Sequence, residues 1–205
     1  MLGETTRDRR QERREATKNE ILEAAWDMAR EGGLASLSLR DLARRVGMSA
    51  PSLYGYFDSK MAIYDAMFGQ GAQQYLEYAR NRPRSGDPLE ELQLGMRNFV
   101  AFCTEDPVRY QLLFQRPIPG FEPSPESYAP SIEGLALVRQ QLADAGLTDQ
   151  KALDLLTAIG NGLADQQISN DPGGDRWTRL VDDAMEMLFD HMTKKATKAR
   201  GRTKK

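Results

Sequence analysis

The sequence predicts an all-α fold of about nine helices. Apolar residues recur with the 3.6-residue period of a helix along almost the whole chain, and no stretch alternates polar and apolar residues over the length of a strand. Glycine, proline and helix-capping residues separate the periodic segments. With 205 residues, of which 40% are hydrophobic, the chain is long enough for one or two domains with buried cores.

The composition argues against several classes of protein. The longest apolar run covers residues 99–103, far short of the roughly 20 residues of a transmembrane helix. A single cysteine, Cys103, forms no intramolecular disulfide, and a single histidine, His191, leaves little for a zinc site or a histidine-based triad. We therefore expect a cytoplasmic protein that is not an enzyme, with no catalytic residue, no metal and no cofactor.

The net charge of −2 hides an uneven distribution. Residues 1–60 hold 11 basic and 10 acidic side chains, residues 61–190 hold 10 and 20, and residues 191–205 hold 7 and 0. The chain thus has an acidic body with basic material at its ends, which suggests that different segments meet different partners. Charged ends that only keep the protein soluble are an equally good explanation.

The first helix is predicted over residues 15–31, and Gly32-Gly33 ends it. Residues 1–14 precede it as a basic, disordered arm in which Asp8 and Glu12 interrupt the arginines. The arm could enter a DNA minor groove or could be a solvated tail, and the sequence leaves both open.

Two short helices follow, joined by a tight turn. Ser38 is placed to cap a helix over 39–46, Gly47 stops it, and Ser49 is placed to cap a helix over 50–57. Short helices joined by about three residues that include a glycine are the sequence form of a helix-turn-helix, here over residues 38–57. An ordinary corner in a helical bundle has the same spacing.

The surface of the second short helix favours nucleic acid. Leu53 and Phe57, one turn apart, can anchor this helix inward. Two tyrosines, a serine and the following Lys60 then form a face rich in hydrogen-bond donors, which suits phosphate and base contacts.

These residues resemble the N-terminal DNA-binding domain of the TetR family of transcriptional regulators. The resemblance is carried by ILEAAWDMAREGG at 21–33, SLRDLA at 38–43, GMS at 47–49, Leu-Tyr at 53–54, Phe57 and Ser-Lys at 59–60. It covers about a quarter of the chain, residues 17–68, strongly. The rest is compatible with the ligand-binding and dimerisation domain of that family.

The resemblance implies a set of DNA-binding residues: Ser38, Arg40, Ser49, Ala50, Pro51, Ser52, Tyr54, Tyr56 and Lys60. Arg40 would reach a base, because a guanidinium can bond guanine O6 and N7 together. The front of the second helix would meet base edges, and the tyrosines and Lys60 would meet phosphates. Tyr56 stands where the family often has histidine, so a phosphate contact there must come from a phenol.

The remaining sequence predicts six more helices and a break at residues 81–88. A proline-rich stretch at 117–125 must be a loop. The expected helices cover residues 59–80 and 89–105, a segment opened by Asp106-Pro107, residues 125–146, a helix capped by Thr148, and a helix capped by Asp175. The tail, residues 194–205, has no acidic residue and is expected to be disordered.

The family resemblance implies an effector pocket in this region, and the Met and aromatic side chains there suit an apolar or aromatic small molecule. The candidates are Met96, Phe99, Phe102, Cys103, Tyr110, Phe114 and Phe121. A packed core without a ligand explains each of these residues equally simply. Cys103 is not expected to be a nucleophile, because its sequence neighbours are apolar and raise a thiol pKa.

The resemblance also implies that the last two helices form a homodimer interface, and their apolar stripes are wider than one neighbour requires. The candidates are Leu155, Ile159, Gly162, Leu163, Ala184 and Leu188. The sequence thus predicts a DNA-binding domain over residues 15–75 and a ligand-binding and dimerisation domain over 76–193. The expected function is a ligand-responsive, homodimeric repressor at a pseudo-palindromic operator, acting in the cytoplasm at the nucleoid. A small-molecule-binding helical protein or an interaction adaptor without specific DNA binding is the alternative.

Overall fold

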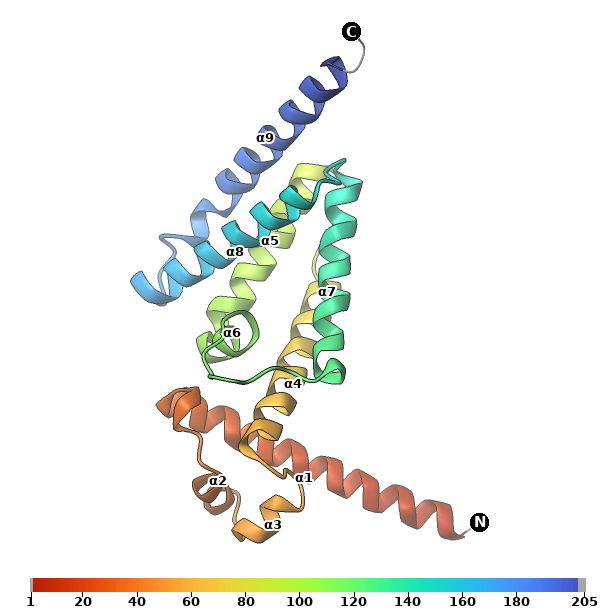
Figure 1. Cartoon of the computed structure of the whole chain (residues 1–205), viewed down its shortest axis with the longest axis vertical. Helices are drawn as coiled ribbons and strands as arrows, with labels where there is room; N and C mark the ends of the chain where they lie inside the picture. The colour runs from red at the N-terminus through yellow and green to blue at the C-terminus, as the bar shows by residue number, and fades with distance from the viewer. Residues whose placement is uncertain (1, 203–205) are drawn as a thin grey trace. The chain divides into compact units, whose positions relative to one another are not determined.

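A computed structural model describes the backbone of residues 2–202 and the side chains of residues 9–194. Over the described backbone the chain is entirely helical, with no strand (Figure 1). The α-helices are α1 (Leu2–Gly32), α2 (Leu39–Arg45), α3 (Ala50–Tyr54), α4 (Lys60–Arg80), α5 (Pro88–Glu105), α6 (Pro107–Phe114), α7 (Pro125–Asp144), α8 (Gln150–Asn170) and α9 (Val181–Arg202). Two 3-10 turns, η1 (Leu34–Ser36) and η2 (Thr178–Leu180), complete the order. None of the described helices is long and apolar enough to cross a membrane.

The chain divides into two compact units, and each has its own core. The N-terminal unit comprises residues 1–71 and 111–128, and the C-terminal unit comprises residues 72–110 and 129–205. The sequence predicts one boundary, between residues 75 and 76. The structure differs in that the segment 111–128 belongs with the N-terminal unit.

The N-terminal unit is built on the apolar face of α1. Ile21 and Ala25 are completely buried there, and the Trp26 indole Nε1 donates a hydrogen bond of 2.7 Å to Gln70 Oε1 on α4. This polar contact satisfies the indole N–H inside an apolar environment. Helix α4 contributes further fully buried side chains to the unit, among them Ile63 and Met67.

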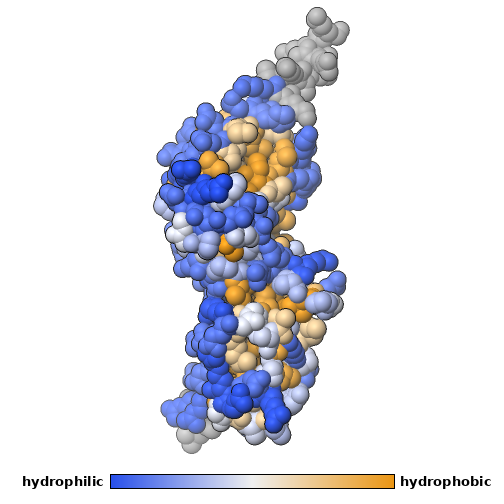
Figure 2. Space-filling view, turned by 90° about the vertical axis from the view of Figure 1, so that its left-hand side faces the viewer, coloured by the Kyte–Doolittle hydropathy of each residue, from blue (hydrophilic) through white to orange (hydrophobic). Residues whose placement is uncertain are grey.

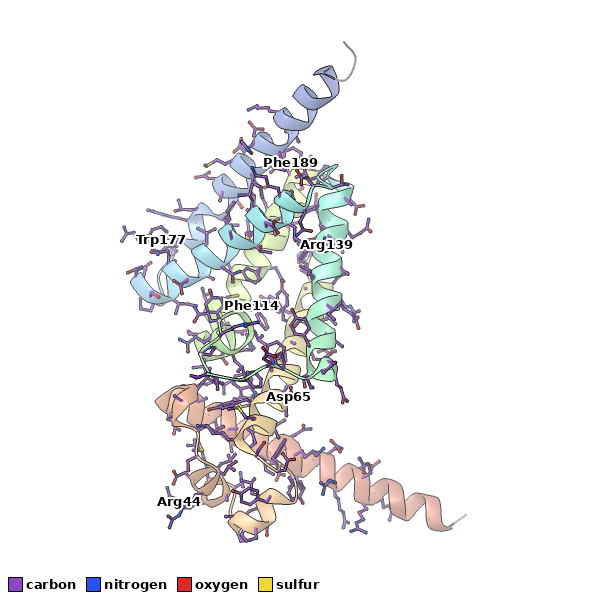
Figure 3. All side chains as sticks on the ribbon, in the orientation of Figure 1. Arg44, Asp65, Phe114, Arg139, Trp177 and Phe189 are labelled. Carbon is purple, nitrogen blue, oxygen red and sulfur yellow. The ribbon has the colours of Figure 1, made fainter. Side chains whose placement is uncertain are left out.

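A carboxylate on α4 ties the segment 111–128 to this unit. Asp65, labelled in Figure 3, accepts hydrogen bonds from the backbone N–H of Ser124 (2.6 Å) and from the hydroxyls of Ser124 and Ser127 (2.9 Å each). The Phe121 ring lies 6.0 Å from the ring of Tyr64, edge to face. Residues about 60 positions apart are thus held together by one acid at the N-terminus of α7, where a helix favours negative charge.

The C-terminal unit is a packed group in which α5, α8 and α9 contact one another. Its core includes Met96, Val100, Met185 and Leu188, all less than 5% exposed. Gly160 on α8 allows a close approach, because a Cβ there would lie 2.9 Å from the sulfur of Met96.

A buried ion pair lies near the start of α5. Arg82 Nη2 is 2.5 Å from Glu91 Oε1, and the two side chains are 3% and 10% exposed. Burial alone would raise the pKa of the Glu91 carboxyl, but hydrogen bonds from Arg82 and Ser85 and the nearby charges of Arg82 and Arg84 outweigh burial and lower that pKa.

Asp106 caps α6 as predicted, because its Oδ1 accepts from the N–H groups of residues 108 and 109. Asp87, which the sequence analysis did not single out, caps α5. Two predicted caps differ in the structure. Helix α8 is capped by Asp149 rather than by the predicted Thr148, because the Asp149 carboxylate accepts from the Lys151 N–H at 3.0 Å. The N-cap moves by one residue to the stronger acceptor.

The start of α9 also differs from the prediction. Asp175 does not cap it; its carbonyl accepts from Arg179 N–H in a turn, and α9 begins only at Val181, after η2. The buried amide of Gln167 accepts from the N–H groups of Trp177 and Thr178, at 2.9 and 3.3 Å, and so fixes the connection before the helix starts.

The two predicted disordered ends are helical over the described backbone. Helix α1 begins at Leu2 instead of residue 15, and α9 continues to Arg202. Where the arm passes into the predicted helix, Gln11 donates to Glu15 Oε1 at 3.1 Å, and Lys18 lies 3.7 Å from the same carboxylate. Such i, i+4 and i, i+3 pairs stabilise a helix.

Candidate nucleic-acid interface

Two side-chain caps build the helix-turn-helix. Ser38 Oγ accepts from the Asp41 N–H at 3.4 Å and starts α2, and Ser49 Oγ accepts from the Ser52 N–H at 3.3 Å and starts α3. Gly47 has a φ of +68° between them, a conformation that suits glycine best. Both caps and the turn confirm the sequence prediction, whereas α3 ends at Tyr54 and is shorter than the predicted 50–57.

Apolar anchors set which face of α3 points outward. Leu53 and Phe57 are 1% and 6% exposed, as the sequence predicts. Pro51, Ser52 and Tyr54 are therefore exposed, and Ala50 and Tyr56 are partly exposed. The Tyr54 phenol is 53% exposed and has no hydrogen-bond partner among the described residues.

The three arginines of α2 have different surroundings. Arg45 makes two 2.7 Å hydrogen bonds to Glu31 of α1, and these bonds lower the pKa of the Glu31 carboxyl. Arg44 extends outward from α2 (Figure 3), where it pairs with Asp41 at 2.8 Å. Arg40 is exposed, and within the described part of the chain it makes no hydrogen bond or ion pair. A guanidinium in that position is available to an external acceptor.

Lys60, at the start of α4, is already held by the protein. Its ammonium donates to the Ala35 carbonyl at 3.0 Å and lies 5.4 Å from the Tyr64 ring centroid. An ammonium has three donors, so two of them stay available to a phosphate. The protein contacts hold the charge in place at the edge of the helix-turn-helix.

Sequence reasoning missed the role of one arm residue. Arg14 Nη2 donates to the Gly55 carbonyl at 2.6 Å, and the guanidinium lies 5.0 Å from the centroid of the Tyr56 ring. The sequence shows Arg14 as one of several arginines in the arm. Its contact spans 41 residues, and no local pattern gives that pairing.

Comparisons with known proteins identify the domain. Residues 21–67 match the family described as bacterial regulatory proteins, tetR family. The chain is 24% identical over 153 residues to the transcriptional repressor KstR of Rhodococcus jostii, covering 75% of this chain and 70% of that protein. It is 26% identical over 162 residues to the class A tetracycline repressor of Escherichia coli, covering 77% and 70%.

The matching segment, residues 21–67, is a DNA-binding domain of the tetR family of bacterial regulatory proteins. The chain is a DNA-binding transcriptional regulator. Among solved structures, the TetR-family regulator PfmR from Thermus thermophilus has the same fold, with a TM-score of 0.59 and 20% identity over 83% of this chain and 97% of that one. The related proteins are transcriptional regulators and not enzymes.

The seven residues predicted for an effector pocket are divided between the two units. Phe114 and Phe121 lie in the N-terminal unit, and the other five lie in the C-terminal unit. Phe102 is enclosed by the rings of Tyr75 and Tyr78, at 5.1 and 5.5 Å, and by the Arg109 guanidinium at 3.7 Å. These neighbours make Phe102 a core residue.

The other pocket candidates of the C-terminal unit lie in its core or at its margin. Met96 packs in the core, and Cys103 and Tyr110 form a small cluster with Ala164 against which the half-buried Phe99 packs. Burial raises the pKa of the Cys103 thiol. Among the side chains described here, no group of three His, Cys, Asp or Glu residues could hold a metal ion.

The α8–α9 face carries exposed apolar residues. Figure 2, in its upper part, shows apolar residues gathered over the side of the C-terminal unit where α8 and α9 lie. Met187 is 72% exposed and Leu180 36%. Of the predicted interface residues, Gly162 is exposed, Leu155, Ile159, Leu163 and Ala184 are partly buried, and Leu188 is a core residue at 4%. Leu188 points inward because it lies one position beyond Met187, about 100° around the helix.

Proposed function

We propose that this regulator is a homodimeric repressor that binds a pseudo-palindromic operator and responds to a small-molecule effector. The observation that carries the proposal is the exposed, unpartnered face of the helix-turn-helix, with Arg40 on α2 and Tyr54 on α3. As a regulator that must reach chromosomal DNA, it would act in the cytoplasm at the nucleoid.

Residue roles within the interface follow from side-chain chemistry. Arg40 would read a guanine, and Ser38 would stand beside it at the start of α2. On α3 the Ala50 methyl and Pro51 would give apolar contacts, for instance to thymine methyl groups, and Ser49 and Ser52 would supply hydroxyls. Tyr54, Tyr56 and Lys60 would contact phosphates, which position the protein without reading sequence.

Dimerisation would use the exposed apolar face of α8 and α9, with Met187 and Gly162 near its centre. A side chain of Met that is 72% exposed costs free energy in water, which association would recover. Two recognition helices in such a dimer would meet successive major grooves, about 34–36 Å apart.

An apolar or aromatic effector would bind in the C-terminal unit beside Phe99, Cys103 and Tyr110. The Phe99 ring is only half buried where it packs against the cluster of Cys103, Tyr110 and Ala164, and the assignment rests on this partly exposed aromatic surface. Effector binding would change DNA affinity only if the effector binds the two DNA-affinity states unequally.

Selection of binding sites from random duplex DNA tests the DNA-binding proposal. We expect the chain to enrich a pseudo-palindrome. Arg40→Ala should relax the preference at one base position in each half-site by about 1–3 kcal/mol. Arg45→Ala is the control, because Glu31 already holds that guanidinium. An unchanged selected sequence for Arg40→Ala would refute the assignment, and no enrichment by the unsubstituted chain would favour an adaptor or a small-molecule-binding protein.

Salt dependence tests the phosphate contact of Lys60. Lys60→Ala should weaken binding to all duplexes alike and reduce the slope of log affinity against log salt by about 1. Lys151→Ala removes an exposed lysine from α8 and should leave the slope unchanged. Equal affinity of Lys60→Ala and the parent at several salt concentrations would contradict the contact.

Sedimentation tests the dimer face. Met187→Asp should give a monomer with weakened operator binding, because a buried unpaired carboxylate opposes association. Ile132→Asp, at a residue of α7 that is 59% exposed, is the matched control and should stay dimeric. A dimeric Met187→Asp protein would place the interface elsewhere.

A further inference from the structure

Arg14 makes two contacts just beyond the C-terminal end of α3, the helix that is proposed to read the operator. Its Nη2 donates to the Gly55 carbonyl at 2.6 Å, and its guanidinium faces the Tyr56 ring with 5.0 Å between the central carbon and the ring centroid. Gly55 is the C-cap of α3, and Tyr56 is the next residue. A single side chain of α1 therefore joins α1 to the point where the recognition helix ends.

This end of α3 needs a partner from outside the helix. Helix α3 has five residues, so its own backbone hydrogen bonds give it little stability. A cation beside the last carbonyls also interacts favourably with the negative end of the helix dipole. The guanidinium supplies both a charged donor to a carbonyl and a planar surface against an aromatic ring.

The neighbouring arm residues lack this arrangement. Among the described residues the Arg13 side chain has no hydrogen bond or ion pair, although it too is exposed and carries the same charge. Arg10, one turn before Arg14, is also exposed, and it makes no such contact with any side chain or backbone group in the described part of the chain. The difference between Arg14 and its neighbours is position on α1, since all three are arginines in the same basic segment.

We propose that Arg14 is a positioning residue for DNA recognition. It holds the C-terminal end of α3 and the ring of Tyr56, so that the exposed face of α3 and the Tyr56 phenol are preorganised before DNA arrives. The proposal rests on the function proposed above, in which α3 reads the operator and Tyr56 contacts a phosphate. Preorganisation favours the specific complex, whose contacts need fixed geometry, more than random-sequence binding, which depends on charge.

Affinities for two duplexes test the role of Arg14: the pseudo-palindrome selected by the unsubstituted chain, and a random-sequence duplex of the same length. Arg14→Ala should weaken operator binding about tenfold more than Arg13→Ala does. On random duplex, the two variants should be equally weakened, because each loses one positive charge. Arg14→Lys keeps the charge and should keep the salt slope, yet it should lose most of the operator preference, since an ammonium has no planar face to lie on the ring.

A double substitution links Arg14 to Tyr56. Tyr56→Phe keeps the ring and removes the phenol, so Arg14→Ala should cost less operator affinity in that background than in the parent chain. In a Trp177→Phe background, Trp26 fluorescence on thermal unfolding monitors the N-terminal unit, so that a loss of affinity from a less stable fold is recognised.

Each outcome decides the proposal. Equal effects of Arg14→Ala and Arg13→Ala on both duplexes would overturn it and leave Arg14 as one more basic residue of the arm. Full rescue by Arg14→Lys would also overturn it, in favour of a direct phosphate contact. If the unsubstituted chain selected no sequence at all, the proposed function would fail first, and positioning by Arg14 would fail with it.

Discussion

Removing one partner of the buried Arg82–Glu91 pair should strongly destabilise the C-terminal unit. The substitution is Glu91→Ala. It deletes a carboxylate that accepts from Arg82 Nη2 at 2.5 Å, from Arg84 Nε at 2.8 Å and from the Ser85 N–H at 2.8 Å. The Arg84 side chain is 60% exposed and can turn to water, but the Arg82 side chain is 3% exposed and cannot.

The expected loss of unfolding free energy follows from the unpaired Arg82 guanidinium that Glu91→Ala leaves buried. Breaking a buried ion pair by deleting one partner costs about 3–5 kcal/mol, because the remaining charge is buried without compensation. Arg82 keeps one hydrogen bond, from Nη1 to the Pro83 carbonyl at 2.8 Å, which places the expectation near the lower end, about 3 kcal/mol. The exposed pair of Arg80 with Glu133, at 2.6 Å, should contribute no more than about 1 kcal/mol.

Fluorescence gives a separate reading for each unit, because Trp26 belongs to the N-terminal unit and Trp177 to the C-terminal unit. In a Trp26→Phe background, urea unfolding followed at Trp177 should show the loss for Glu91→Ala and almost none for Glu133→Ala. Equal losses for the two variants would refute the assignment of a buried, mutually dependent pair. An unchanged midpoint for Glu91→Ala would refute it as well.

The remaining predictions concern pH, capping, burial and packing. The pKa of the Glu91 carboxyl is lowered in the folded chain. The stabilisation that this carboxylate provides should therefore be complete above its pKa in the unfolded chain, about 4.3, and should be lost as the pH falls through its lower pKa in the folded chain. The urea midpoints of Glu91→Gln and the parent should accordingly converge in acid. Ser38→Ala should cost about 1 kcal/mol of N-terminal-unit stability, read at Trp26, because α2 loses its N-cap. Cys103 should resist alkylation at neutral pH until urea unfolds the chain, because burial raises its thiol pKa. Gly160→Ala should destabilise the C-terminal unit by about 1–3 kcal/mol, because its Cβ would meet the Met96 sulfur at 2.9 Å and the Phe99 ring at 3.1 Å. Gly134→Ala on α7, whose Cβ would lie 3.7 Å from the Tyr75 ring, should not.

Structural features that depend only on neighbouring residues in the sequence could be predicted. The caps at Ser38 and Ser49, the positive φ of Gly47 and the inward anchors Leu53 and Phe57 all depend on neighbours at most four positions away. The helix-turn-helix was therefore predicted nearly residue by residue. The errors at Thr148 and Asp175 were also local, and in each case a nearby carboxylate or amide competed for the same backbone groups.

Features that depend on distant residues could not be predicted in this way. The membership of residues 111–128 in the N-terminal unit depends on hydrogen bonds from Ser124 and Ser127 to Asp65. These residues are 59 and 62 positions apart in the sequence, and the periodicity of apolar residues gives no information about contacts over such separations. The Arg14 contact with Gly55 is similar, since the sequence shows a run of arginines and only the fold distinguishes one of them.

Charge, by contrast, is a weak guide to the interface even when the fold is known. Residues 1–60 carry a net charge of only +1, and several of their basic side chains are already engaged by the protein itself: Arg45 by Glu31, Lys60 by a carbonyl, and Arg14 by Gly55. What favours DNA there is the arrangement of donors, in which Arg40 and Tyr54 are left without protein partners among the described residues while their engaged neighbours fix the helices that carry them. The affinity for a particular sequence should therefore depend more on these fixed positions than on the number of positive charges, and the contrast between Arg14→Ala and Arg13→Ala, two variants of equal charge, measures that difference directly.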